Sequence, residues 1–197
     1  MNKACMLKVD IYQTLEDRGN DEEIESHGPY KCLCHSSNGL LKKGVKEPWL
    51  GEGYYFWDTR IEDAYWWGSV AYPTAGYVVC HTTYDQYSPF LFDMVGRVDH
   101  YEEFIKCAAY IKSQKNLERI SFPTVLAFLK KHADFPYKAI RVHPMPKYVK
   151  DNGIYFPGKS LVISEIAKIQ ICFFDNTMWM SEYKIVDRKS AFANQTI

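Results

Sequence analysis

Residues 51–68 read GEGYYFWDTRIEDAYWWG, and they predict a strand followed by a helix. Residues 54–57 are all aromatic, and strands favour aromatic side chains. Residues 59–62 have the pattern of a capping box, in which a threonine is followed three positions later by a glutamate. We therefore expect a strand at 54–57 and a short helix that begins after this box, runs through Trp66 and ends at Gly68.

Outward from this stretch, strand and helix patterns follow each other in no regular order. Residues 1–28 are polar and acidic, and we expect them to form a short first element and an exposed loop. Apolar residues at helical spacing predict two further helices, at 100–113 with Asp99 as cap and at 123–132. Runs rich in β-branched and aromatic residues predict the other strands, at 30–36, 77–84, 89–95, 138–142, 160–164, 168–174 and 183–187. A mixture without β-α-β alternation is typical of the α+β class.

Length and composition limit the function classes. A chain of 197 residues is most often one domain, so we expect a single domain over 1–197. Lys+Arg and Asp+Glu number 24 each, and the zero net charge argues against a protein that binds nucleic acid mainly through electrostatics, although a local basic groove stays possible. Aromatic residues make up 16% of the chain, which suits a protein that holds a flat ligand.

The sequence gives no sign of a membrane or an export route. It has no run of ~18 apolar residues, so we expect no transmembrane helix and no membrane partner. The first residues, MNKACMLKVDIYQTLEDRG, lack the apolar stretch of a signal peptide. We therefore expect a cytoplasmic protein whose six cysteines are reduced.

The closest group of cysteines is Cys32-Leu33-Cys34-His35. A zinc site usually needs two paired clusters with turn-forming spacing, and the sequence has one cluster without a C-x-x-C pair. On the strand expected at 30–36, Cys32 and Cys34 share one face while His35 lies on the other. We therefore expect two buried thiols that pack in the core, and we assign no metal.

Three motifs, taken in order, resemble those of the ADP-ribosyltransferase superfamily, in the branch of diphtheria toxin and the poly(ADP-ribose) polymerases. The segment His35-Ser36-Ser37 stands where that branch has H-G-[ST]. Residues 51–56, GEGYYF, match its G-x-G-x-Y-F motif, and Ala64 and Trp66 fall where it has a helix alanine and a stacking tyrosine. Residues 164–171, SEIAKIQI, are similar to its late strand region.

The resemblance implies a fold and a chemistry. The fold is a split, mixed or antiparallel sheet with a few short helices, and NAD is the substrate whose nicotinamide–ribose bond is cleaved. Tyr55 would stack on the nicotinamide, and a ring from Tyr65 or Trp66 would close the other side. His35, with Ser36 beside it, would bind the adenosine ribose. Gly53 would let the backbone approach the ligand closely.

The third catalytic position implied by the resemblance needs a carboxylate, because positive charge develops on the ribose in the transition state. Alignment with the polymerase pattern puts Ser160 at this position, whereas a shifted register puts Glu165 there. The two residues are five positions apart, so on a continuous strand they face opposite sides. We take Glu165 as the catalytic acid because the chemistry requires a carboxylate, and Ser160 as a cofactor-binding neighbour.

These motifs predict a mono-ADP-ribosyltransferase that modifies a macromolecular acceptor, either protein or nucleic acid. A single catalytic domain of this length is similar to stand-alone microbial toxins and antiviral defence effectors, which would give it an antitoxin or another partner protein. Two alternatives stay open: a module of the same fold that only holds NAD or a partner, and an NAD glycohydrolase. In a purely structural interpretation, the aromatic rings of 54–57 pack the two faces of a sheet and His35 is a capping or core residue.

Overall fold

The computed structural model describes residues 6–38, 40–45, 47–144 and 168–190, together with the backbone of 153–155 and 162–164. The described strands form one mixed seven-stranded sheet of order β4-β5-β8-β2-β1-β3-β9 and a separate pair, β6-β7. The strands are β1 (Lys8–Glu16), β2 (Tyr54–Asp58), β3 (Tyr77–Asp85), β4 (Leu91–Asp93), β5 (Ala139–Val142), β6 (Gly153–Tyr155), β7 (Val162–Ser164), β8 (Gln170–Phe173) and β9 (Lys184–Lys189). The helices are α1 (Asp21–His27), α2 (Ile61–Ala71), α3 (Val98–Lys115) and α4 (Phe122–His132).

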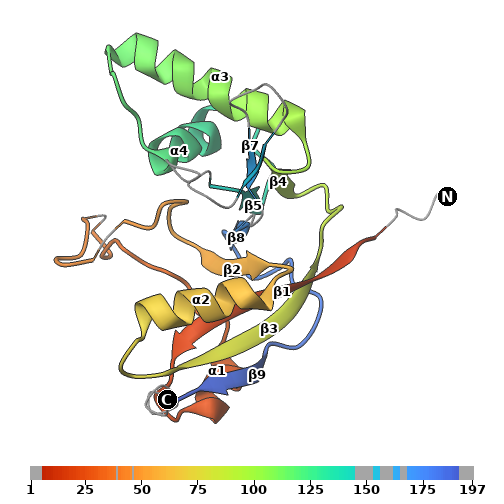
Figure 1. Cartoon of the computed structure of the whole chain (residues 1–197). Helices are drawn as coiled ribbons and strands as arrows, with labels where there is room; N and C mark the ends of the chain where they lie inside the picture. The colour runs from red at the N-terminus through yellow and green to blue at the C-terminus, as the bar shows by residue number, and fades with distance from the viewer. Residues whose placement is uncertain are drawn as a thin grey trace.

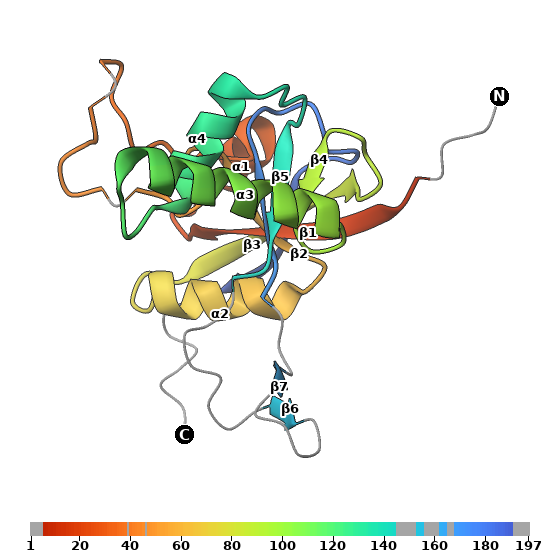
Figure 2. The ribbon, with the colours of Figure 1, turned by 90° about the horizontal axis from the view of Figure 1, so that it is seen from above.

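The predicted α+β class is confirmed by this sheet and its helices. Strand β4 pairs with β5 in parallel, and the other pairs of the sheet are antiparallel. In Figure 1, α3 and α4 lie at the β4–β5 end of the sheet, and α1 lies near β9. The turned view of Figure 2 shows α2 on one side of the strands, with α3 and α4 on the other.

Strand β1 is a nine-residue interior strand of the sheet, and part of the exposed loop predicted after it forms α1, which corrects the prediction of a short element and an exposed loop for residues 1–28. It pairs antiparallel with β2 on one side and with β3 on the other. The buried amide of Gln13 is fully bonded: Nε2 donates to the carbonyl oxygens of Tyr30 (3.1 Å) and Tyr55 (3.2 Å), and Oε1 accepts from the Tyr183 hydroxyl (2.7 Å). A glutamine can therefore occupy the core side of this strand, since both its amide nitrogen and its amide oxygen have hydrogen-bond partners.

The strand predicted at 30–36 does not form. The segment makes two isolated bridges, Cys32 with Gly53 and His35 with Leu41, in place of a ladder. The prediction of two buried thiols is correct for Cys34 and wrong for Cys32, which is exposed. The described cysteines, Cys32, Cys34, Cys80, Cys107 and Cys172, are all free thiols.

Helix α2 forms where residues 51–68 predict a helix, but both of its ends differ from the prediction. Thr59 has a left-handed backbone (φ 66°) and its side chain bonds Asp58, so the predicted capping box is absent and Arg60 is the N-cap residue. The helix continues past Gly68 to Ala71. Gly68 packs against the ring of Tyr77 on β3, where an added Cβ would lie 2.6 Å from Cε2. This close approach explains the glycine better than a helix end does.

Helices α3 and α4 cover a second core and confirm the two predicted helices in outline. Helix α3 begins at Val98 after the N-cap Arg97, so Asp99 lies in its first turn and is not its cap. Helix α4 is capped by Ser121, whose Oγ accepts from the Thr124 backbone N–H (3.3 Å). The two helices pack on β4, β5 and β8 through buried apolar side chains, among them Phe104, Ile111, Leu126, Leu129 and Ile140. The predicted strands at 77–84, 138–142, 168–174 and 183–187 are present, and their ends differ from the prediction by at most two residues.

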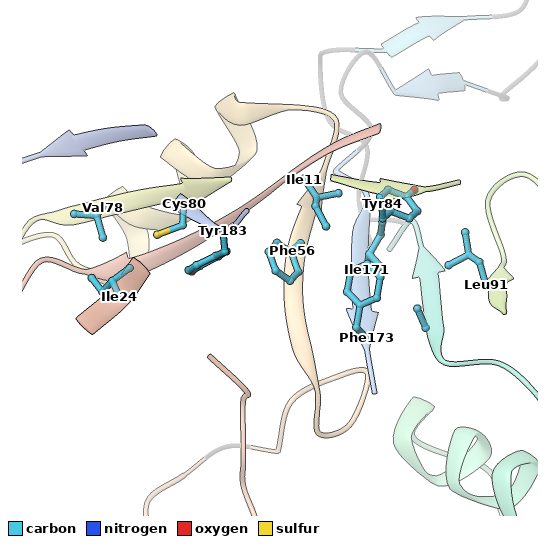
Figure 3. Close-up of a cluster of buried hydrophobic side chains, with 11 residues drawn as sticks. Ile11, Ile24, Phe56, Val78, Cys80, Tyr84, Leu91, Ile171, Phe173 and Tyr183 are labelled. Carbon is cyan, nitrogen blue, oxygen red and sulfur yellow. The ribbon is translucent and has the colours of Figure 1, made fainter. Parts of the chain in front are cut away.

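The main core lies under β1, β2, β3 and β8. Figure 3 shows Phe56 and Phe173 at the centre of this cluster, with Tyr84 and Tyr183 beside them. The rings of Phe56 and Phe173 meet edge to face at 5.7 Å between centroids. Within the described part of the chain, none of the helices combines the length and the apolar character that crossing a bilayer requires.

A buried ion-pair network joins four strands. The Arg141 guanidinium on β5 donates from Nε to Asp58 Oδ2 on β2 (2.7 Å) and from Nη1 to Asp93 Oδ1 on β4 (3.2 Å). The Tyr84 hydroxyl on β3 donates to the other oxygen of Asp58 (3.4 Å). Because all four side chains are buried, each charge depends on its partners for stabilisation.

We expect the stability of the fold to decrease on mild acidification because of His100. This ring is buried, stacks on Phe92 at 4.6 Å, and accepts at Nδ1 from the Asp93 backbone N–H (2.9 Å). Burial lowers its pKa below the ordinary 6.5, so the unfolded chain takes up the proton more readily than the folded one. Stability contributed by the neutral ring is therefore lost as the pH falls below about 6.5.

Urea unfolding of the wild type and of His100→Asn across about pH 7.5 to 5 tests this expectation. The asparagine can still accept the Asp93 N–H bond but does not titrate. The wild type should lose more stability than the variant over this interval. Equal pH slopes in the two proteins would contradict the assignment.

Candidate functional site

A cavity of about 840 Å³ opens between β1, β2, α2 and the segments that follow β5 and precede β8. Its lining is dominated by aromatic side chains, namely Tyr30, Trp49, Tyr55, Trp57, Trp66, Trp67 and Tyr72. A volume of this size falls in the range of small-molecule and cofactor sites, which are mostly apolar with a few polar groups. We therefore take it as the candidate functional site.

Three tryptophans form one wall of the cavity. Trp57 comes from β2, and Trp66 and Trp67 come from α2. The centroid distances are 5.8 Å for Trp57–Trp66, 6.4 Å for Trp57–Trp67 and 6.2 Å for Trp66–Trp67. Trp66 is 43% exposed and Trp67 41%, so both keep ring surface available for a flat ligand.

The polar part of the lining is positive or hydrogen-bonding. Lys31, His143 and Lys168 face the cavity, and Lys168 Nζ lies 3.2 Å from the centroid of the Trp66 ring. Burial lowers the pKa of Lys168. The described lining residues include no Asp or Glu. The cavity is therefore suited to a ligand that combines a flat ring with negative or acceptor groups.

Tyr55 lies in the cavity wall with its hydroxyl bound to the protein. The hydroxyl accepts from the Leu50 N–H (2.9 Å) and donates to the Gly51 carbonyl (2.7 Å). Burial strongly raises its pKa, so the phenol stays neutral. Its ring can present a face to a ligand, while its hydroxyl holds the 50–51 turn and is not free to act as an acid or base.

Of the residues that the sequence predicts for the site, the cavity brings together Tyr55 and Trp66. Tyr65 does not line the cavity, and its ring centroid lies 5.2 Å from Nζ of Lys189 on β9. Burial, together with Asp187 of β9, raises its pKa to about 12. Ser36 bonds within its own turn, to Asn38 Oδ1 (2.6 Å) and to the Leu40 carbonyl (2.9 Å). Glu165 and Ser160 lie outside the described residues.

His35 does not line the cavity either. Its Nδ1 lies 3.2 Å from Glu52 Oε1 and 3.2 Å from Cys34 Sγ. The ribose-binding role that the resemblance implies for His35 stays a prediction. In the structure its ring is engaged by a carboxylate and a thiol.

Position 53 requires a glycine because the neighbouring strand leaves no room for a side chain. A Cβ at this position would collide with Cys172 Sγ and lie 2.6 Å from the Phe173 carbonyl oxygen, both on β8. Gly53 also pairs with Cys32, which does line the cavity. The glycine thus allows β2 and β8 to approach each other next to the cavity.

Several lining residues were not predicted from the sequence. Trp49 is fixed by Gln170 of β8, because its indole Nε1 donates to Oε1 at 2.6 Å. Thr14 of β1 bonds the Ala64 carbonyl of α2 (2.8 Å) and fixes the helix over the strand. Period-two alternation of Val9, Ile11 and Leu15 was the available signal for β1, since it marks a strand with one buried face.

Comparison with known proteins gives no match for this chain: no protein-family model fits it, and no curated protein or solved structure is significantly similar to it.

Proposed function

We propose that this protein is an NAD-dependent mono-ADP-ribosyltransferase that binds NAD in the aromatic cavity. The observation that carries the proposal is the combination of tryptophan rings and ammonium groups in one cavity of about 840 Å³. NAD joins two flat rings through a pyrophosphate, so it needs stacking surfaces at its ends and positive charge between them. The rings of Trp66, Trp67 and Tyr55 supply the stacking surfaces, and the ammonium groups of Lys31 and Lys168 supply the positive charge.

The reaction breaks the bond between the ribose C1′ and the nicotinamide nitrogen. The electron pair leaves with neutral nicotinamide, and a nucleophile of the acceptor forms the new bond to C1′ and releases a proton. Positive charge on the ribose in the transition state calls for a nearby carboxylate. We assign this role to Glu165, which a shifted register of the late motif puts at the third position, whereas direct alignment puts Ser160 there. The acceptor is a protein or a nucleic acid. With water as the acceptor the same site would act as an NAD glycohydrolase.

A binding module without catalysis is the second candidate. It is favoured by the absence of Asp and Glu among the described lining residues. The two candidates share NAD binding and differ in turnover, so release of nicotinamide from bound NAD separates them. In either case a cytoplasmic location and a partner protein, such as an antitoxin, are part of the proposal.

We expect Trp66→Ala to weaken NAD binding by about 1–3 kcal/mol, which is about 5- to 150-fold in Kd. The ring lies in the cavity wall with 43% of its surface exposed, so its removal deletes stacking area and disturbs the core little. Titration calorimetry with NAD measures the change, and thermal unfolding shows whether the variant is folded.

Tyr101→Ala is the matched control, because it removes a half-exposed aromatic ring from α3, outside the cavity. Its Kd for NAD should equal that of the wild type. If Trp66→Ala binds NAD as tightly as Tyr101→Ala, NAD does not occupy this cavity.

A further inference from the structure

Three metal-ligating side chains converge at a second place in the fold, where the 32–41 loop meets the residues before β2. Cys34 Sγ and His35 Nδ1 are 3.2 Å apart, and His35 Nδ1 and Glu52 Oε1 are 3.2 Å apart. The three donor atoms lie within 4.8 Å of one another. None of the three residues lines the aromatic cavity, so the cluster lies outside it.

The backbone holds this cluster in place. Glu52 Oε1 accepts from the N–H groups of Cys34 (2.8 Å) and His35 (2.7 Å), which fixes the carboxylate against the two residues that supply the other donors. Hydrogen bonds of this kind orient ligands in metal sites and keep them preorganised.

The charges and the donor types favour one class of ion. A thiolate from Cys34 and the carboxylate of Glu52 together would neutralise a divalent cation, with His35 as a neutral third ligand. A sulfur, a nitrogen and an oxygen donor suit the borderline-soft Zn²⁺ and not Mg²⁺ or Ca²⁺, which prefer oxygen alone. Binding would release the thiol proton, since the thiolate is the ligand.

We propose that Cys34, His35 and Glu52 form a three-ligand Zn²⁺ site that clips the 32–41 loop to the start of β2. Three protein ligands leave a fourth position of the tetrahedron for water or another exogenous ligand. The side chains of His35 and Glu52 are 40% and 29% exposed, which leaves a path for the ion to the buried thiol. The metal site lies next to one wall of the cavity, because the neighbouring residues Cys32 and Tyr55 line the cavity and Cys32 pairs with Gly53.

The test uses the full chain, stripped of metal with a chelator and titrated with Zn²⁺ by calorimetry and with Co²⁺ by absorption spectroscopy. We expect one ion per chain and, with Co²⁺, a near-ultraviolet thiolate-to-metal charge-transfer band. His35→Gln and Glu52→Gln should each weaken Zn²⁺ binding at least about 10-fold, because even outer-shell partners of a metal site are worth about 10- to 100-fold. Cys34→Ser should abolish the charge-transfer band.

The controls separate this site from adventitious binding. Cys32→Ser removes the exposed thiol two positions away, and His27→Gln removes an exposed imidazole; both should bind Zn²⁺ like the wild type. If Cys34→Ser fails to fold, Zn²⁺ binding by His35→Gln still tests the proposal, because the polar contacts of the His35 ring are confined to the cluster. Absence of one-to-one binding in the wild type, or equal affinity in His35→Gln, would overturn the proposal.

Discussion

Replacement of Arg141 by leucine should lower the free energy of unfolding by about 3–5 kcal/mol, the typical cost of removing one partner of a buried ion pair. Arg141 bonds Asp58 and Asp93, and all three side chains are at least nine-tenths buried. Leucine fills part of the volume but leaves two buried carboxylates without a cation. Urea unfolding of the two proteins at neutral pH measures the difference, and equal m-values would show that the unfolding reaction is the same.

Arg97→Leu is the matched control for this substitution. Arg97 also pairs with an aspartate, Asp99, but both side chains are more than half exposed. Exposed ion pairs contribute little because water and salt screen them. If Arg141→Leu and Arg97→Leu lower stability equally, the network does not hold the sheet together in the way we describe.

Glu165→Gln should leave NAD binding nearly intact while slowing nicotinamide release and ADP-ribosyl transfer at least ~100-fold. In the ground state the neutral amide can still hydrogen-bond a ribose hydroxyl. In the transition state positive charge grows on the ribose, and only a carboxylate responds to it; this difference is worth ~3 kcal/mol of barrier, which is ~100-fold in rate. Labelled NAD with a cell lysate, treated separately with protease and nuclease, measures transfer and identifies the acceptor class.

Asp63→Asn provides the comparison for the catalytic acid. Asp63 lies on α2 one turn before Trp66, is buried outside the cavity lining, and has a pKa raised by burial. Its isosteric replacement should change turnover little. Full activity in Glu165→Gln would remove Glu165 from the catalytic position, and Ser160→Ala would then test the other register.

The elements that the sequence predicts well are those whose signal is local. The aromatic run of β2, the β-branched run of β3 and the helical spacing of apolar residues in α4 all depend on neighbouring residues, and each element forms close to its predicted place. The cavity residues Tyr55 and Trp66 were predicted from the motifs that resemble those of the ADP-ribosyltransferases, and both lie on elements with a local signal, β2 and α2.

The elements that the sequence predicts wrongly are controlled by distant partners. Residues 30–36 have strand-forming composition, but the N–H groups of Cys34 and His35 bond the Glu52 carboxylate where a strand would bond its neighbour. In β1 the polar Gln13 interrupts the apolar alternation that marks the strand, and the partners that bond its side chain, Tyr30 and Tyr183, come from other parts of the chain. No local pattern reports such contacts.

The cavity as a whole could not be derived from the sequence either. Its wall joins Trp49, Trp57 and Lys168, which come from three segments that meet only in the folded sheet. The link between Trp49 and Gln170 spans 121 positions of the chain. The aromatic content predicted a protein that holds a flat ligand, but the arrangement of the rings required the fold.

The most direct test of NAD binding in this cavity is tryptophan fluorescence during an NAD titration. Four of the five tryptophans, Trp49, Trp57, Trp66 and Trp67, line the cavity, and the conservative variant Trp179→Phe removes the fifth. In this variant all tryptophan emission comes from the cavity wall. We predict a saturable change in emission whose midpoint equals the calorimetric Kd. Emission that stays constant, or that falls only in proportion to the absorbance of added NAD, would contradict NAD binding in the cavity.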